Sequence, residues 1–135
     1  MKVIVTGSRY TSDRELVNGV LLHFIENVGP ITEIVYRFNV GVDLLAKTWA
    51  EDLGILQRRF TPDWRDLNVK NARILIDSTG VKYNVNAELT RDELMIKRAD
   101  VLVLIWKANL PPLMSQIRHI ANTNGLPIYQ YVYPE

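Results

Sequence analysis

The residues best suited to chemistry stand in an early turn, Thr6-Gly7-Ser8-Arg9, directly after an apolar stretch from Val3 to Val5. Glycine lets a ligand approach the main chain closely. A serine hydroxyl, a guanidinium and the free amides of a following helix all favour an anion. In an open α/β sheet, ligands bind beyond the carboxyl end of such a strand. The turn therefore predicts a phosphate-binding site, and an ordinary strand-to-helix turn is the alternative interpretation.

Further candidates follow the second and third predicted strands. Gly41 would allow a tight turn, and Asp43 would either cap the next helix or hold a ligand hydroxyl. Asp63 and Trp64 follow the third strand, where the indole would stack on a flat ring or join the core. A hydrolase needs a placed acid or base. Glu93 and Asp63, together with Asp43, are the candidates for that role.

Alternating strand and helix patterns provide the scaffold for these residues. Stretches of strand length run from Ile34 to Tyr36, from Ile55 to Phe60 and from Val101 to Trp106. The last of these is continuously apolar, which is typical of a central parallel strand covered on both faces. Arg58 and Arg59 indicate an edge position for the third strand.

Helix signals separate these strands. Ser12–Glu15 and Thr90–Glu93 have the spacing of capping boxes and predict helices that begin there, the second running through Arg98. The Pro111–Pro112 pair fits the first turn of a later helix. The predicted fold class is α/β: a single Rossmann-like domain over residues 1–135, with a mostly parallel sheet flanked by helices.

Two segments stand outside this alternation. Arg73–Asp77 and Val81–Val85 flank a Ser-Thr-Gly turn, which predicts an inserted β-hairpin around 73–85. Pro127–Tyr133 predicts a last strand or tail that carries three tyrosines on one face. Such a face contacts either another subunit or the monomer's own core. We expect a homodimer or a higher homo-oligomer, with the hairpin and the tyrosine segment at the contact.

Composition limits the class of protein. The chain has 135 residues, of which 47% are hydrophobic, and 16 basic residues balance 15 acidic ones. This balance disfavours a general nucleic-acid binder. The absence of cysteine excludes disulfides and zinc–thiolate sites, and no metal or cofactor is expected. No targeting or membrane-spanning segment is recognised, so we expect a cytoplasmic protein.

Several motifs taken together resemble a known family. They are Lys2–Arg9, Thr61–Trp64 and Ala99–Trp106. This pattern is similar to the YspA-like branch of the SLOG superfamily, whose members have a Rossmann-like fold and bind nucleotides or nucleotide-derived ligands. The resemblance extends over nearly the whole chain, with the hairpin as an insertion.

The resemblance implies a ligand pocket built from several loops. Gly41 and Asp43 match the end of the family's second loop, and Asp63 and Trp64 match the third. Glu93 matches the glutamate of the family's Arg-Asn-Arg-Glu-Met element. The ligand-binding residues that the resemblance implies are Gly7, Ser8, Arg9, Gly41, Asp43, Asp63, Trp64 and Glu93. We also expect Tyr10, Phe38, Asn39 and Arg91 to contact the ligand.

The chain also departs from the family pattern. The second loop usually begins with His-Gly-Gly, but Tyr36–Asn39 stands in its place here. Pro112–Leu113 replaces a Gly-Thr turn, and proline offers no amide to a phosphate. The Pro-Gly-Gly-x-Gly-Thr loop of the related Lonely Guy phosphoribohydrolases is absent. We therefore expect a site that binds its ligand without catalysis.

Three functions follow from this comparison. The favoured function is binding of a nucleotide-derived small molecule. Its biological role would be the sequestration of a defence signalling nucleotide by a phage protein. The second is a nucleoside-phosphate glycosidase or hydrolase of the Lonely Guy type, with Glu93 or Asp63 as the acid or base. The third is a binding module related to DNA processing, which the neutral charge disfavours.

Overall fold

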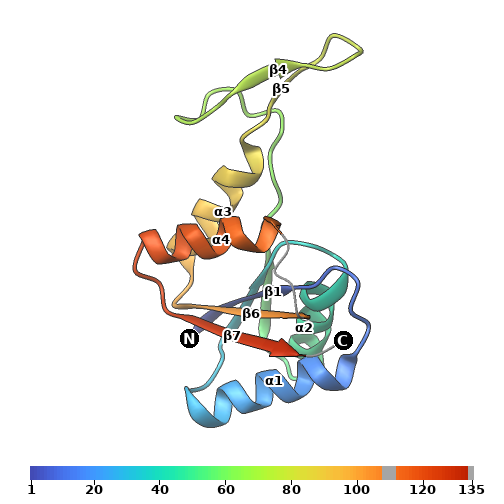
Figure 1. Cartoon of the computed structure of the whole chain (residues 1–135), viewed down its shortest axis with the longest axis vertical. Helices are drawn as coiled ribbons and strands as arrows, with labels where there is room; N and C mark the ends of the chain where they lie inside the picture. Colours follow the sequence, from blue (N-terminus) through green and yellow to red (C-terminus); the bar gives the residue numbers. More distant parts are fainter. Residues whose placement is uncertain (108–111, 134–135) are drawn as a thin grey trace.

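A five-stranded parallel sheet forms the centre of the molecule, with strand order β3-β2-β1-β6-β7. The computed structural model describes residues 1–107 and 112–133. Helices cover both faces of the sheet (Figure 1). The strands of this sheet are β1 (Lys2–Gly7), β2 (Glu33–Tyr36), β3 (Leu56–Arg59), β6 (Val101–Lys107) and β7 (Ile128–Tyr133). The helices are α1 (Arg14–Asn27), α2 (Gly41–Asp52), α3 (Ala87–Arg98) and α4 (Pro112–Thr123). The predicted α/β, Rossmann-like fold class is confirmed.

The order of the strands reverses between β1 and β6. The chain adds β2 and β3 on one side of β1, and then crosses back to place β6 and β7 on the other. Because all neighbours are parallel, the carboxyl ends of the strands meet at one edge. In open α/β sheets the crevice at such a reversal is the usual ligand site. Here it lies at the paired ends Gly7 and Ile105.

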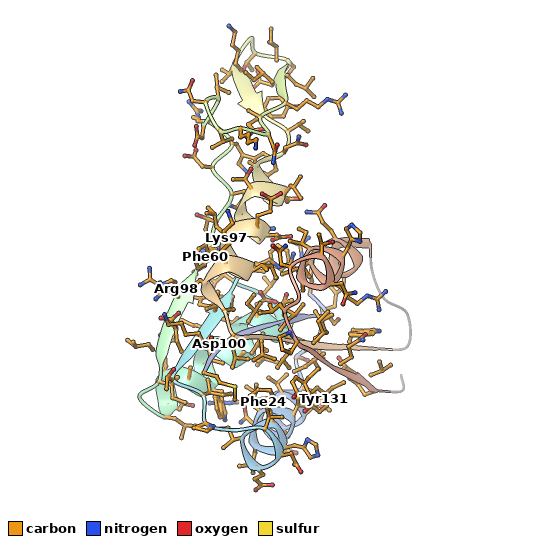
Figure 2. All side chains as sticks on the ribbon, turned by 90° about the vertical axis from the view of Figure 1, so that its left-hand side faces the viewer. Phe24, Phe60, Lys97, Arg98, Asp100 and Tyr131 are labelled. Atoms are coloured by element: carbon orange, nitrogen blue, oxygen red, sulfur yellow. The ribbon has the colours of Figure 1, made fainter. Side chains whose placement is uncertain are left out.

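Alternate side chains of the strands build two separate cores. Val3, Val5 and Val103 face helices α1 and α2, whereas Ile4 and Leu104 face α3 and α4. The central strands are buried on both faces, which accounts for their continuous apolar sequences. The tyrosines of β7 join the first core: Tyr131 packs against it, and Figure 2 shows Tyr131 beside Phe24 of α1.

The predicted hairpin is confirmed as the antiparallel pair β4 (Ile74–Ile76) and β5 (Lys82–Asn84). It stands away from the sheet, beyond the first turn of α3 (Figure 1). Ile74, Leu75 and Ile76 are all exposed, Ile76 at 64%. An isolated two-stranded hairpin has little stability in water. This segment is therefore an apolar arm with no core of its own.

Both capping boxes were placed wrongly. Asp13, not Ser12, caps α1, because its carboxylate accepts a hydrogen bond of 3.0 Å from the Leu16 amide. Helix α3 begins a turn earlier than predicted, after Asn86, because Ala87 and its neighbours are good helix formers. Thr90 lies inside that first turn, where its hydroxyl donates to the Asn86 carbonyl.

The predicted start of the last helix falls partly outside the described residues. Helix α4 begins at Pro112, as the proline predicts, but residues 108–111 lie outside the described part of the chain. The predicted strand at Pro127–Tyr133 is confirmed as β7, an edge strand parallel to β6. Among residues 1–107 and 112–133, no helix is long and apolar enough to cross a membrane.

A partly buried ion pair joins β2 to the end of α3 and gives a pH-dependent prediction. Arg98 donates two hydrogen bonds to Glu33, of 2.7 and 2.8 Å, and the Glu33 side chain is 6% exposed. These bonds, helped by the charges of Arg98, Arg58 and Lys2, hold the pKa of Glu33 below its ordinary value of 4.5 despite burial. A carboxyl group with a lowered pKa stabilises the fold above its unfolded pKa. This stabilisation is lost as the pH falls below 4.5 through the folded-state value.

Glu33→Gln is therefore expected to lower the free energy of unfolding by about 1–2 kcal/mol at pH 7, measured by urea denaturation. The difference from the unsubstituted chain should shrink as the pH falls below 4.5. Glu51→Gln is the matched control, since Glu51 pairs with Lys47 on an exposed surface of α2. A Glu33→Gln penalty of equal size at pH 7 and pH 3 would contradict this assignment.

Candidate functional site

The turn after β1 is held between two other elements at the carboxyl edge of the sheet. The Ser8 amide donates to the Ile105 carbonyl of β6 at 3.1 Å, and the Val42 amide of α2 donates to the Ser8 carbonyl at 3.0 Å. The Ser8 hydroxyl accepts from the Tyr10 amide at 3.4 Å. The turn is thus fixed beside the amino end of α2, where the helix dipole favours an anion.

Gly7 and Gly41 make this arrangement possible. A Cβ atom on Gly7 would lie 1.7 Å from the Ile105 carbonyl oxygen. A Cβ atom on Gly41, whose φ is +61°, would lie 2.2 Å from the Ser8 carbonyl oxygen. Both glycines therefore let protein main chains approach each other, whereas the sequence predicts the approach of a ligand at Gly7 and a tight turn at Gly41.

Asp43 is buried at the same edge of the sheet, where its carboxylate connects several protein groups. Its carboxylate accepts hydrogen bonds from the Thr6 hydroxyl at 2.7 Å and from the amides of Arg37 and Phe38 at 2.8 and 3.0 Å. Burial raises the pKa of Asp43, and the Arg37 charge and these hydrogen bonds oppose the rise. With 1% of the residue exposed, the carboxylate faces protein groups that tie β1 to the loop after β2.

Three guanidinium groups surround the ring of Phe38. Their central carbons lie 4.7 Å (Arg9), 4.6 Å (Arg37) and 5.5 Å (Arg91) from its centroid. These distances allow cation–π attraction. Arg37 and Arg91 are buried, at 1% and 3% exposure, whereas Arg9 is exposed. The fold therefore gathers cations from the turn after β1, the loop after β2 and helix α3.

Asp92 forms ion pairs with both buried arginines of this group. Its carboxylate lies 3.3 Å from Arg37 Nη1 and 2.9 Å from Arg91 Nε. Burial lowers the pKa of the Arg37 guanidinium, while the charges of Asp92 and Asp43 raise it. The four buried groups, two arginines and two aspartates, balance in charge. Arg9 is thus the cation of this cluster that is available to a bound anion.

Arg37 and Asp92 were missed as site residues when only the sequence was considered, and Thr6 was included only as part of the turn motif. One signal was available for Arg37, which directly follows the buried strand Ile34–Tyr36, where ligand-facing residues are common. Asp92 lies inside the predicted capping box Thr90–Glu93, where no role was predicted for this residue, and its burial follows from the earlier start of α3.

The remaining predicted site residues differ in their exposure and in their surroundings. Tyr10 is 94% exposed, and Asn39 is also exposed. Trp64 is 40% exposed, and its carbonyl accepts a hydrogen bond from the Asn84 amide. Asp63 lines a cavity of about 220 Å³ that Arg91 also lines.

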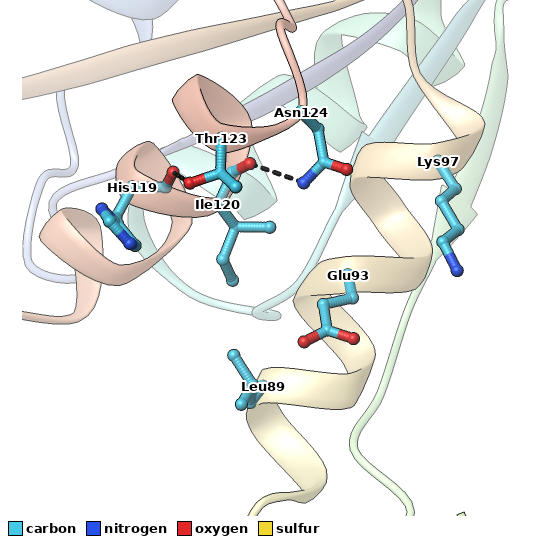
Figure 3. A pocket seen from close by; sticks show the side chains of 7 residues that line it. All are labelled: Leu89, Glu93, Lys97, His119, Ile120, Thr123 and Asn124. Carbon is cyan, nitrogen blue, oxygen red and sulfur yellow. Dashed lines mark hydrogen bonds between the residues drawn. The ribbon is translucent and has the colours of Figure 1, made fainter. Parts of the chain in front are cut away.

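Glu93 lines a different cavity, of about 280 Å³, between α3 and α4. Figure 3 shows Glu93 and Leu89 extending from α3 towards the last turns of α4, which carry His119 and Ile120. The described residues that line this cavity include neither Asp63 nor any part of the turn Gly7–Arg9. The two candidate acids are therefore in separate cavities. No cluster of three or more metal-ligating side chains occurs in the described parts of the chain.

The fold and this edge together define a Rossmann-like ligand-binding domain with a positively charged turn at its strand reversal. Residues 1–66 match the model of the YspA, cpYpsA-related SLOG family, which supports the resemblance to the YspA-like branch of the SLOG superfamily. The resemblance of the Lys2–Arg9 and Thr61–Trp64 motifs is thereby confirmed, and it indicates nucleotide-derived ligands in general. No curated protein and no solved structure gave a significant match.

Proposed function

We propose that this chain binds the phosphate of a nucleotide-derived small molecule at Arg9 and holds the molecule without changing it. The observation that carries the proposal is the position of Arg9, exposed beside Phe38 and next to the amino end of α2. The carboxylates that balance the buried Arg37 and Arg91 leave the positive charge of Arg9 in excess. A guanidinium with a helix amino end is a strong combination for phosphate.

The placement of the carboxylates supports binding without catalysis. Asp43 is occupied by Thr6 and the main chain, and Asp63 already accepts the Arg65 amide. Glu93 lines a cavity that includes no residue of the turn Gly7–Arg9. A glycosidase needs an acid or base within hydrogen-bond reach of the bond that it breaks. A protein that holds a signalling nucleotide unchanged is suited to sequester it, and phage anti-defence is the role we propose.

The test of capture uses nucleoside monophosphates, cyclic dinucleotides and ADP-ribose derivatives. Each is mixed with the purified protein, separated from free ligand, recovered by heating and identified by chromatography with mass spectrometry. Recovery of the unchanged compound supports capture. Release of a free base would instead favour the hydrolase, and Glu93→Gln and Asp63→Asn would then show which carboxylate acts.

Arg9→Ala is expected to weaken binding of the captured nucleotide about tenfold or more, because a charge-assisted contact to phosphate is lost. Isothermal titration calorimetry at two salt concentrations measures this change. Lys82→Ala is the matched control, since it removes an exposed cation on β5 in the hairpin. Equal affinities of the two variants would remove Arg9 from the site.

We also propose that two copies of the chain associate through the hairpin. The exposure of apolar side chains on an arm without a core of its own supports this proposal; they are Ile74, Ile76 and Val81. The β7 tyrosines are already engaged with the monomer, since Tyr129 packs edge-on to Phe24 and Tyr133 donates to Thr11. They are therefore a weaker candidate for the contact.

Ile74→Ser/Ile76→Ser is expected to convert a dimer to a monomer in analytical ultracentrifugation, because it removes apolar area from the arm. Leu53→Ser is the control, since Leu53 is 59% exposed at the end of α2. A monomeric unsubstituted chain would refute the proposal.

A further inference from the structure

A second cavity lies where the segment after β3 meets the end of β5 and the start of α3. Its volume is about 220 Å³. The residues that matter for its chemistry are Asn84 and Arg91 as donors, Asp63 and Asp66 as acceptors, and the apolar Val69 and Leu94. This cavity depends on the inserted hairpin, because Asn84 is the last residue of β5.

Asn84 presents a donor whose orientation is fixed by the main chain. Its Oδ1 accepts hydrogen bonds of 3.0 Å from the amides of both Arg73 and Asn86. The carboxamide cannot be reversed without losing both bonds, so Nδ2 is the donor. The residue is 1% exposed, and Nδ2 has no hydrogen-bond partner among the described residues.

Arg91 presents a second buried donor. Its Nε donates to Asp92 at 2.9 Å, whereas its Nη2 has no hydrogen-bond partner in the described part of the chain. Buried donors without partners are costly to a fold. Two of them on residues that line one cavity indicate an occupant that supplies acceptor atoms.

The remaining lining identifies the kind of occupant. Asp63 and Asp66 each accept an amide two residues later with Oδ1, from Arg65 and Asn68, and their carboxylates disfavour a further anion. Asp92 already neutralises the charge of Arg91. Val69 and Leu94 supply apolar surface. A cavity of about 220 Å³ is also smaller than the sites that enclose whole drug-sized ligands.

We propose that this cavity binds a nucleobase, a neutral ring that presents acceptors to Asn84 and Arg91 and donors to Asp63 or Asp66. The assignment rests on the proposed function, with the base belonging to the nucleotide whose phosphate Arg9 holds. Arg91 connects the two regions, because it lines the cavity and also lies 5.5 Å from the Phe38 ring. The inserted hairpin thus sets which base is accepted.

Asn84→Asp tests the base site with little change in shape. The variant keeps the oxygen that holds Arg73 and Asn86, and replaces the donor with an acceptor. Calorimetric titrations with adenosine, guanosine, cytidine and uridine should show one preferred nucleoside, and Asn84→Asp should bind it about tenfold more weakly or worse. Asn122→Asp, on an exposed position of α4, is the matched control and should not change the affinity.

Ribose 5-phosphate separates this assignment from the proposed function. Its binding should be weakened by Arg9→Ala and unaffected by Asn84→Asp. If nucleotides bind and Arg9→Ala weakens them, but Asn84→Asp behaves like Asn122→Asp, the base site is wrong and the proposed function stands. If nucleosides bind with the Asn84 dependence while ribose 5-phosphate does not bind, the base site stands and the phosphate assignment is wrong.

A measurement on the unsubstituted protein covers the case in which Asn84→Asp fails to fold. The assigned side-chain amide resonance of Asn84 should shift on addition of the preferred nucleoside and remain in place with inorganic phosphate. Absence of any shift with all four nucleosides would overturn the proposal.

Discussion

Gly7→Ala is expected to lower the free energy of unfolding by about 3 kcal/mol or more, although it adds only one methyl group. The added Cβ would lie 1.7 Å from the carbonyl oxygen of Ile105 and 2.7 Å from its carbonyl carbon. These are main-chain atoms of β6, the strand paired with β1, so a side-chain rotation cannot relieve the overlap. The two central strands would have to separate at their carboxyl ends.

Gly19→Ala is the matched control and is expected to have the opposite sign. Gly19 lies inside α1, and a Cβ there would meet nothing within 4 Å. Alanine should therefore stabilise the chain by about 0.5–1 kcal/mol through helix propensity. Thermal and urea denaturation of the two variants measure both changes. Similar stabilities of Gly7→Ala and Gly19→Ala would show that β1 and β6 do not approach as closely as described.

Gly7→Ala should also impair ligand capture in the molecules that do fold. The Ser8 amide donates to the same Ile105 carbonyl, so separation of the strands would displace the turn that carries Arg9. Packing and binding are thus coupled at this glycine. The sequence motif Thr6-Gly7-Ser8-Arg9 predicted a ligand turn at this edge of the sheet, but the physical need for its glycine comes from β6, a strand almost a hundred residues later.

The fold was predictable because its signals are local. Continuous apolar stretches such as Val101–Trp106 predicted buried parallel strands, and alternation with helices predicted the doubly covered sheet. The arginine pair in β3 correctly indicated an edge strand. The start of α1 was predicted wrongly because Ser12 and Asp13 are adjacent candidates for the cap, and only the three-dimensional turn selects Asp13.

The charged cluster was not predictable in the same way. The cluster combines a loop and a helix that are more than fifty residues apart, namely Arg37 and Phe38 with Arg91 and Asp92. No sequence pattern indicates that these residues lie together. Only the tertiary fold brings three arginines to one aromatic ring and gives two of them the same aspartate as a partner. Arg91 alone would be interpreted as a phosphate ligand, whereas the fold gives it Asp92 as a partner.

Asp92→Asn is expected to lower the free energy of unfolding by about 3 kcal/mol or more, because it removes the negative charge shared by two buried arginines. The substitution keeps the size of the side chain, so no cavity contributes to the loss. The Arg37 and Asp92 side chains are 0% and 1% exposed, so water cannot replace the lost charge. The introduced carboxamide would also turn amide hydrogens towards guanidinium groups that need an acceptor.

Asp52→Asn makes the same chemical change in an exposed ion pair. Asp52 lies 2.6 Å from Arg14, but their side chains are 58% and 55% exposed. Water and salt screen such a pair, so its loss should cost less than about 1 kcal/mol. Urea denaturation of both variants in low and high salt separates the two cases, since salt should diminish the Asp52 effect and leave most of the Asp92 effect.

The Asp92 variant also tests whether the buried arginines contribute to anion binding as well as to stability. With the aspartate gone, the buried arginines carry uncompensated charge, and a phosphate near Arg9 would partly replace the missing anion. Inorganic phosphate should therefore raise the melting temperature of Asp92→Asn more than that of Asp52→Asn. Equal increases would mean that the buried arginines are insulated from the ligand, and that Arg9 alone senses it.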